Sequence, residues 1–339
     1  MINKSSNLVF MSILFISVLI SISANSWFVV WMGMEINMMA FLPLMMEQNN
    51  NLSKESALTY FLTQTIASMI FIMSMLMTMI GFSGINSTLG GVSSSMMMSA
   101  LMIKSGISPF HFWMPKVMEG LTWNKCLILM TWQKIIPLMV MSNIIEMNSI
   151  TITAMILSII FGAIGGLNQT SLRKLMAYSS ISNNGWMMAA MMMSELAWLL
   201  YFSFYSIMTM IMTISMNTYK NYHMNQLISM NETTYKKYFL LLNMLSISGL
   251  PPMMGFIPKW IIIQYSMSNI ELTLMGLMVM LTLITIFYYL RLMFSVVMLS
   301  STMPKWNIIK NKKINMMTMV LSNLSIMGLT LITIMISLY

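Results

Sequence analysis

Hydrophobic positions fill long segments of the chain, and short polar stretches separate them. A transmembrane helix needs about 20 mostly apolar residues, and the pattern predicts eleven such helices. These segments are apolar on all sides, whereas the strands of a membrane barrel would alternate polar and apolar positions over about 10 residues. The predicted spans cover residues 8–24, 27–46, 57–82, 91–121, 122–145, 149–170, 172–193, 195–216, 236–268, 272–300 and 314–338.

Composition supports the same fold class. Only 7% of the 339 residues are charged, against roughly a quarter in a typical soluble protein. Hydrophobic residues make up 58%, which is more than a single soluble core of this length can bury. The first six residues contain one basic residue, Lys4, and no small-residue cleavage site, so 8–24 is expected to be a retained span. We therefore predict an all-α polytopic membrane protein forming a single membrane domain over 1–339.

Basic residues show the strong asymmetry between loops that fixes membrane orientation. The loops after odd-numbered spans hold none, but they contain Glu146, Glu195 and Glu271. We therefore expect the N-terminus inside and, with eleven spans, the C-terminus outside. The basic residues of the N-terminus and of the loops after even-numbered spans are Lys4, Lys54, Lys116, Lys125, Arg173, Lys174, Lys220, Lys236, Lys237, Lys305, Lys310, Lys312 and Lys313.

Two predicted spans, 91–121 and 236–268, are too long for one crossing and contain related Gly-Pro interruptions. Ser105-Gly106-Ile107-Ser108-Pro109 matches Ser248-Gly249-Leu250-Pro251-Pro252, and Pro115-Lys116 matches Pro258-Lys259 at the same offset. These discontinuous helices are the fourth and ninth, so two five-helix units would cross the membrane in opposite senses. This pattern is typical of inverted-repeat transporters. The predicted units are 1–146 and 149–313, followed by a last helix at 314–338.

A few charged residues lie well inside the predicted spans, away from the ends that border the loops, where an unpaired charge costs at least about 2.5–3.5 kcal/mol. They are Glu35, Lys104, Lys134, Lys259 and Arg291. Several such charges in one chain indicate a hydrated or paired interior, and hence proton or ion movement.

Lys104 precedes the first interruption, and Glu35 is the intramembrane carboxylate available to it. The pair would carry protons or, alternatively, only lock two helices together. Lys134 lies near mid-depth, three residues before Pro137, where it cannot reach either membrane interface. It is either the centre of a relay or a structural lysine bonded to carbonyls freed at Pro137.

The remaining ionisable positions are more ambiguous. Lys259 follows the second interruption and could either act in transport or extend toward the outer interface. Arg291 is expected to extend to the inner interface with its stem on neighbouring tyrosines. His111 titrates near neutrality and is a candidate for a supporting relay role, with a structural histidine bonded to freed backbone as the alternative.

Several other classes of function are excluded by what the sequence lacks. It contains no dinucleotide or P-loop motif, no metal-spaced cluster and no Ser-His-acid arrangement. We therefore expect no cofactor and no metal in this chain. Cys126 is the single cysteine, so there is no internal disulfide. The 51 methionines fit a mitochondrial-type codon bias better than a copper path, and the net charge of +9 forms no nucleic-acid stripe.

Several motifs resemble the family of antiporter-like subunits 2 of mitochondrial NADH:ubiquinone oxidoreductase, respiratory complex I. The matching stretches run Trp31-Met32-Gly33-Met34-Glu35-Ile36-Asn37, Lys104 through Ser108-Pro109-Phe110-His111-Phe112-Trp113-Met114-Pro115, Thr131-Trp132-Gln133-Lys134, and Ser248-Gly249-Leu250-Pro251-Pro252 to Gly255-Phe256 and Pro258-Lys259-Trp260. Eleven spans resemble the shortened animal form. Lys116 departs from the pattern, since relatives often have an acidic or neutral residue there.

The resemblance implies a core membrane-arm subunit of a proton pump in the mitochondrial inner membrane, with its N-terminus on the matrix side and its C-terminus on the intermembrane-space side. It implies that Glu35 and Lys104 form a coupling pair, that Lys134 is the central lysine, and that Lys259 is the terminal one. NADH, FMN, iron–sulfur clusters and ubiquinone would bind to other subunits. Partners would be membrane lipid and other membrane-arm subunits, antiporter-like ones included, and the chain alone would not function. The alternatives are a stand-alone Mrp-type cation/proton antiporter and a purely structural subunit.

Overall fold

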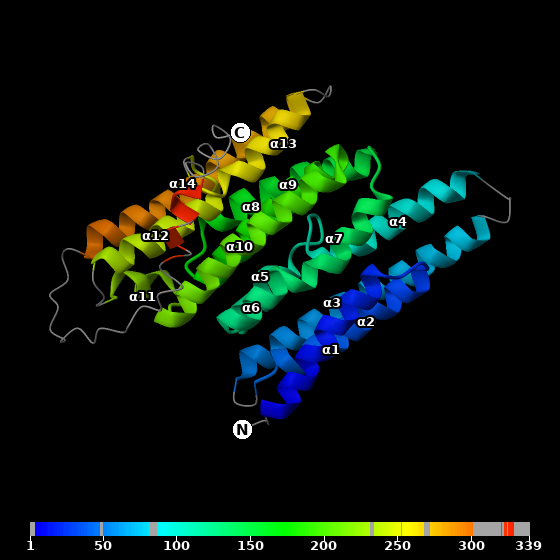
Figure 1. Ribbon diagram of the computed structural model, residues 1–339, viewed down its shortest axis with the longest axis horizontal. Helices are drawn as coiled ribbons and strands as arrows, with labels where there is room; N and C mark the ends of the chain where they lie inside the picture. Colours follow the sequence, from blue (N-terminus) through cyan, green and yellow to red (C-terminus); the bar gives the residue numbers. More distant parts are fainter. Residues whose placement is uncertain are drawn as a thin grey trace. The chain divides into compact units, whose positions relative to one another are not determined.

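The computed structural model describes residues 4–47, 50–81, 87–230, 234–251, 253–267 and 272–300, and parts of 320–328. All regular structure within these ranges is helical, apart from one isolated bridge between Ser171 and His223 (Figure 1). The chain divides into two compact units, Met1–Ala154 and Met155–Tyr339. Each unit is described separately below.

The first unit is built around α3, which packs against α2, α4 and α5, while α1 packs on α2 and α4 on α7. Its helices are α1 (Lys4–Ile22), α2 (Trp27–Met45), α3 (Asn51–Gly81), α4 (Ser87–Ser105), α5 (Trp113–Gly120), α6 (Trp123–Met130), α7 (Trp132–Ile144) and the start of α8 (Ser149–Leu167).

In the second unit α10 packs against α9, α12 and α13, and α14 packs against α11, α12 and α13. Its helices are the rest of α8, α9 (Leu172–Met193), α10 (Glu195–Tyr219), α11 (Met224–Ile228), α12 (Thr234–Ser248), α13 (Phe256–Met267) and α14 (Leu272–Ser300). Helix α9 is buried on nearly every side.

A glycine in the left-handed region ends both α4 and α12. Gly106 has φ +73° and Gly249 has φ +84°, a conformation that glycine adopts without steric penalty. After α4, the amide of Gly106 donates to Ile103 O at 3.3 Å and that of Ile107 to Met102 O at 3.0 Å. This is the hydrogen-bond pattern of a Schellman motif. Helix α5 then begins at Trp113, and α13 begins at Phe256.

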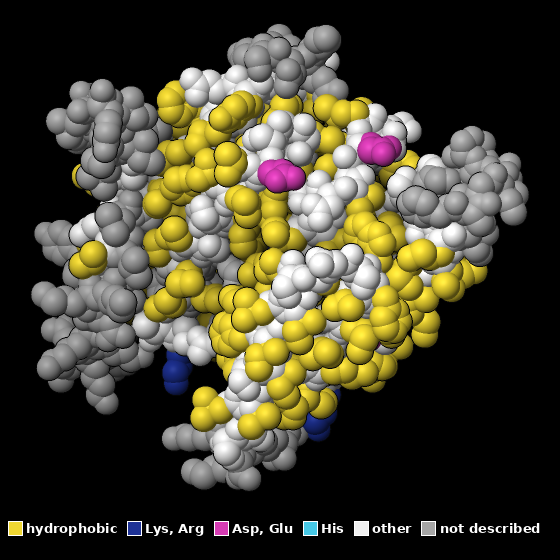
Figure 2. All heavy atoms as spheres, turned by 45° about the vertical axis from the view of Figure 1, so that its right-hand side comes forward, with side chains coloured by type: hydrophobic (Ala, Val, Ile, Leu, Met, Phe, Trp, Pro, Cys, Tyr) yellow, Lys and Arg dark blue, Asp and Glu magenta, His cyan; other side chains and the backbone are white. Residues whose placement is uncertain are grey.

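Seven of the described helical stretches are long and apolar enough to cross a membrane. Figure 2 shows that hydrophobic side chains dominate the described surface on the face in view. The protein is therefore an all-helical, multi-pass membrane protein, as its composition predicted.

Two departures from the predicted helix boundaries concern the division of a span and a loop. The segment 122–145, predicted as one helix, is divided at Thr131 into α6 and α7. The predicted loop 217–235 contains the short helix α11. The predicted helix 314–338 lies largely outside the described residues, as does the basic loop 301–313.

Candidate functional site

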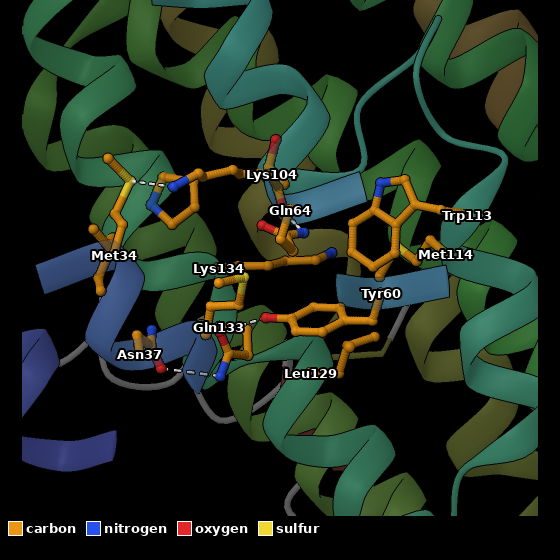
Figure 3. A pocket seen from close by; sticks show the side chains of 14 residues that line it. Met34, Asn37, Tyr60, Gln64, Lys104, Trp113, Met114, Leu129, Gln133 and Lys134 are labelled. Atoms are coloured by element: carbon orange, nitrogen blue, oxygen red, sulfur yellow. Dashed lines mark hydrogen bonds between the residues drawn. The ribbon is translucent and has the colours of Figure 1, made fainter. Parts of the chain in front are cut away.

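A small cavity lined by both polar and apolar side chains lies inside the first unit, and its volume of about 20 Å³ leaves room for about one water molecule. Lys104 from α4 and Lys134 from α7 both line it (Figure 3). The two lysines are separated by thirty residues along the chain, and the packing of α4 on α7 places both at one cavity. The other lining residues are Met34, Asn37, Met38, Tyr60, Gln64, Ser105, Trp113, Met114, Leu129, Gln133, Ile136 and Pro137.

Lys104 occupies the last turn of α4, directly before the glycine that ends the helix. Its side chain is buried, and Nζ lies 3.5 Å from Met34 Sδ. Its backbone carbonyl accepts a 3.5 Å hydrogen bond from Gln64 Nε2 on α3. The ammonium therefore contacts a weak thioether acceptor, whereas the backbone is held by a neighbouring helix.

Glu35 does not form the direct ion pair with Lys104 that the sequence analysis considered. Lys125 and Glu47, by contrast, do form an ion pair, with Nζ 2.6 Å from Oε1. The buried Oε1 of Glu35 has no hydrogen-bond partner among the described residues. Met34, the adjacent residue on α2, presents its side chain to Lys104 instead.

Lys134 lies close to the start of α7 and is 2% exposed. Its amide donates to Thr131 O, three residues back, at 3.2 Å, so the helical hydrogen bonding is irregular here. Pro137 lies within α7 and lacks an amide donor. The sequence analysis expected irregular backbone from Pro137, but the division of the helix at Thr131 had no such signal.

Three hydrogen-bonded polar side chains form part of the wall of the cavity. Tyr60 Oη donates to Gln133 Oε1 at 3.3 Å, and Gln133 Nε2 donates to Asn37 Oδ1 at 3.0 Å (Figure 3). The sequence analysis did not single out Tyr60 or Gln64. Their signal was available, since they stand four positions apart in an apolar segment and therefore share one face of α3.

Lys259 belongs to the second unit, on α13, and is 7% exposed. Its Nζ donates to Ser248 O at 2.7 Å, a carbonyl at the end of α12. A Cβ added to Gly249 would lie 2.8 Å from the same Nζ. The lysine thus turns back to the helix end instead of extending outward, so the snorkelling alternative is wrong for this structure.

Three other basic residues have different surroundings. His111 is buried between α4 and α5 and stacks on Phe112 at 4.3 Å between ring centroids, outside the lining of the lysine cavity. Arg291 is exposed, and its Nη2 donates to Leu167 O at the end of α8. Lys116 is exposed on α5, unlike Lys259 at the matching offset.

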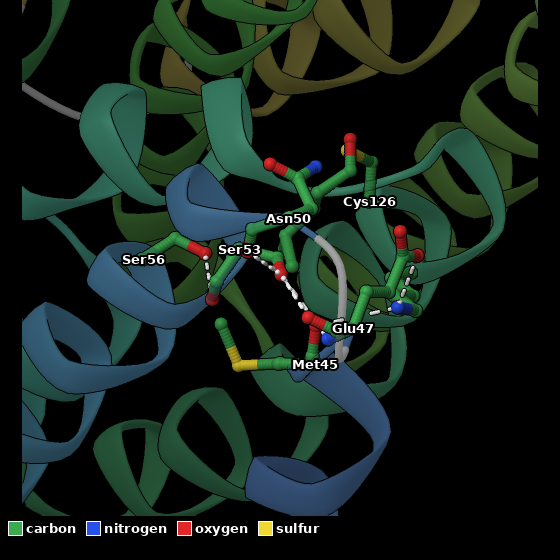
Figure 4. Close-up of polar contacts among 8 residues, drawn as sticks. Met45, Glu47, Asn50, Ser53, Ser56 and Cys126 are labelled. Atoms are coloured by element: carbon green, nitrogen blue, oxygen red, sulfur yellow. Dashed lines mark hydrogen bonds and ion pairs between the residues drawn. The ribbon is translucent and has the colours of Figure 1, made fainter. Parts of the chain in front are cut away.

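A second polar cluster joins the end of α2 to α6 (Figure 4). Lys125 Nζ lies 2.6 Å from Glu47 Oε1 and 3.3 Å from Met45 O. Ser53 at the start of α3 accepts from the Glu47 amide at 3.1 Å. Carboxylate, carbonyl and ammonium together anchor α6 beside the α2–α3 connection.

The described residues contain no group of three or more His, Cys, Asp or Glu side chains that could hold a metal ion. Cys126 is buried, with Sγ 3.6 Å from Met118 O.

Comparison with known proteins places these features in a family. Residues 24–285 match the family described as NADH:quinone oxidoreductase/Mrp antiporter, TM. NADH-ubiquinone oxidoreductase chain 2 of Aedes aegypti is 46% identical over 334 residues, covering 97% of this chain and 98% of the relative. The chain 2 protein of Locusta migratoria is 40% identical, with 97% and 96% coverage. The chain belongs to the NADH-ubiquinone oxidoreductase chain 2 family.

Solved structures agree at the level of the fold. A chain of respiratory complex I from Thermus thermophilus aligns with a TM-score of 0.77 at 19% identity, over 95% of this chain and 78% of that one. A chain of the Mrp complex from a Dietzia species aligns with a TM-score of 0.73 at 13% identity, over 84% of this chain and 59% of that one. As a chain 2 family member, the protein is a membrane subunit of the proton-pumping NADH:ubiquinone oxidoreductase, which confirms the family and function that the sequence motifs predicted.

Proposed function

We propose that this complex I subunit relays protons through Glu35, Lys104 and Lys134 in its first unit and through Lys259 in its second. The observation that carries the proposal is that Lys104 and Lys134, on two different helices, line one cavity inside the first unit. Intramembrane ionisable groups that face such an interior commonly mark proton pathways.

Each lysine can hold one proton on a compact ammonium group. Because interactions between charges are strong where water is scarce, a change of charge at Glu35 or Lys104 would alter the charge state favoured at Lys134. Water within the cavity would carry the proton between the two amines. Protonation would then alternate along the pathway in response to a distant redox event.

The proposal includes a specific membrane arrangement. Eleven spans would form two inverted five-helix units, 1–146 and 149–313, with a last helix at 314–338. The pairs α4/α5 and α12/α13 would be the halves of the two discontinuous spans. Related Gly-Pro motifs at the ends of α4 and α12 support this arrangement, and such helices border the transport site in inverted-repeat transporters.

The proposed location is the mitochondrial inner membrane, since the similar chain 2 proteins come from animals. The lysine asymmetry supports a matrix-side N-terminus and a C-terminus on the intermembrane-space side. Other membrane-arm subunits, antiporter-like ones among them, would be the partners. NADH, FMN, iron–sulfur clusters and ubiquinone would bind elsewhere in the complex, because this sequence has no motif for them.

Replacement of Lys134 tests the relay. Lys134→Ala in the intact complex, reconstituted into liposomes, should lower the proton-to-electron ratio or the coupled turnover, because the cavity loses one of its proton carriers. Lys54→Ala, which removes an exposed lysine of α3, is the matched control and should leave both values unchanged. Normal values of both quantities in Lys134→Ala would contradict the relay.

The same experiment distinguishes the scaffold alternative. If neutralising Lys104 and Lys134 blocked assembly, yet the complexes that formed pumped normally, the charges would serve assembly alone. For the stand-alone antiporter, the purified chain would exchange cations for protons in liposomes without its partners. The structural likeness to the Mrp chain concerns the fold and does not favour that activity.

A further inference from the structure

One face of α3 contacts both lysine-bearing helices of the first unit. Tyr60 and Gln64 stand one turn apart on that face, and both line the cavity. Gln64 Nε2 donates to the backbone carbonyl of Lys104 on α4. Tyr60 Oη donates to Gln133, the neighbour of Lys134 on α7. Helix α3 therefore forms hydrogen bonds to both sides of the cavity.

The ring of Tyr60 is held firmly in place. It makes edge-to-face contacts with Phe41 at 5.5 Å and Trp113 at 5.9 Å between centroids, and it is 3% exposed. Trp113 in turn donates from Nε1 to Ile103 O at 2.9 Å, one residue before Lys104. The hydroxyl of Tyr60 thus has a fixed position relative to the end of α4.

The acceptor of this hydroxyl is also fixed. Gln133 Nε2 donates to Asn37 Oδ1, which orients the amide so that Oε1 faces Tyr60 (Figure 3). Asn37 lies two residues after Glu35 on α2. The three side chains join α2, α3 and α7 at the wall of the lysine cavity.

We propose that the Tyr60 hydroxyl, oriented by Gln133, is a positioning group that orders the water between Lys104 and Lys134. The proposal rests on the proposed relay function and adds a residue to it. A phenol has one hydrogen to donate and can also accept hydrogen bonds. Because Tyr60 donates its hydrogen to Gln133, its oxygen can accept a hydrogen bond from water in the cavity. Tyr60 itself neither gains nor loses a proton.

Removal of this hydroxyl is the direct test. Tyr60→Phe keeps the ring and its two aromatic contacts but deletes one hydrogen-bonding group. Loss of one ordered hydrogen bond on the transfer path predicts about a five-fold lower coupled turnover. The solvent deuterium isotope effect on that turnover should rise, because proton transfer becomes slower relative to the other steps. Tyr238→Phe, which deletes the hydroxyl of a tyrosine that is 47% exposed, should change neither quantity.

The isotope effect separates positioning from mere structural support. A destabilised complex would be less abundant, but each intact complex would show the wild-type isotope effect. Unchanged turnover and isotope effect in Tyr60→Phe would overturn the proposal. Lys134→Ala in the same preparation reports on the relay itself: if it impairs pumping while Tyr60→Phe does not, only the role of Tyr60 fails.

A second variant tests the same hydrogen bond if Tyr60→Phe assembles poorly. Gln133→Met removes the acceptor and leaves the Tyr60 ring contacts intact, so it should reproduce the slower turnover and the larger isotope effect. The double variant should be no worse than either single one if the hydroxyl acts through Gln133. Multiplied effects in the double variant, or normal pumping by Gln133→Met, would contradict the proposal.

Discussion

Helices α4 and α12 end in the same way, but the lysines near the two helix ends have different partners. Each helix ends in a left-handed glycine, Gly106 or Gly249. After α4, the indole of Trp113 binds the carbonyl of Ile103, and the ammonium of Lys104 lies 3.5 Å from the sulfur of Met34. After α12, the ammonium of Lys259 itself binds the carbonyl of Ser248.

The two lysines differ in the free energy needed to break the present contact of the ammonium group. A neutral donor satisfies the backbone at the first interruption, so Lys104 can exchange a weak sulfur contact for water at little cost. Lys259 must break a 2.7 Å bond to a buried carbonyl, and an unsatisfied buried carbonyl is unfavourable by about 1–3 kcal/mol. Similar backbone motifs thus hold one weakly bound ammonium and one ammonium anchored to a carbonyl.

The glycines should give the largest difference between the two interruptions. Gly249→Ala forces a side chain into the left-handed region, which costs about 1–2 kcal/mol, and its Cβ would lie 2.8 Å from Lys259 Nζ. Gly106→Ala carries the same backbone penalty, but its nearest neighbour is the flexible Met114 sulfur at 3.2 Å. Thermal inactivation of the intact complex should therefore be faster in Gly249→Ala than in Gly106→Ala. Equal rates would show that Gly249 is not fitted to Lys259.

Replacing the lysines themselves should have a smaller effect on stability than Gly249→Ala, because it removes a hydrogen bond without adding backbone strain. Lys259→Met leaves Ser248 O without its donor, a loss of about 1–3 kcal/mol. Lys104→Met removes only a weak contact with Met34 and should be nearly neutral in stability, although both variants are expected to lower pumping. Chemical denaturation of the purified complex, followed by the retention of this subunit, measures the difference. A larger loss in Lys104→Met would reverse the comparison.

The smallest effect is expected at Lys116, which occupies the position matching Lys259. Its side chain is exposed, and exposed charges contribute little to stability. Lys116→Gln should therefore leave both thermal inactivation and coupled turnover unchanged. A marked loss of turnover would show that the two matching lysines share a role in spite of their different burial.

Sequence reasoning placed Lys236 and Lys237 in a loop, although both are buried at the start of α12. It located the glycines of both interruptions and the buried Lys104, Lys134 and Lys259, because Gly, Pro and charged residues are conspicuous in apolar segments. It could not assign partners. Whether Lys104 meets Glu35 or Met34 depends on the rotation of α2, since these neighbours project about 100° apart on a helix. The spacing of Tyr60 and Gln64 places them on one face of α3, but nothing in the sequence places the Tyr60 hydroxyl beside Gln133. Thr131 gave no local signal for the division between α6 and α7.

That division at Thr131 has a mechanical consequence. Helix α6 is tied to the α2–α3 connection by Lys125, Glu47 and Met45, whereas Lys134 is carried by α7, beyond the division. The start of α7 is held separately, because Trp132 donates to Leu14 O on α1 and Gln133 bonds to Asn37 on α2 and Tyr60 on α3. The division thus separates two anchoring networks, and the central amine belongs to the one formed with α1, α2 and α3.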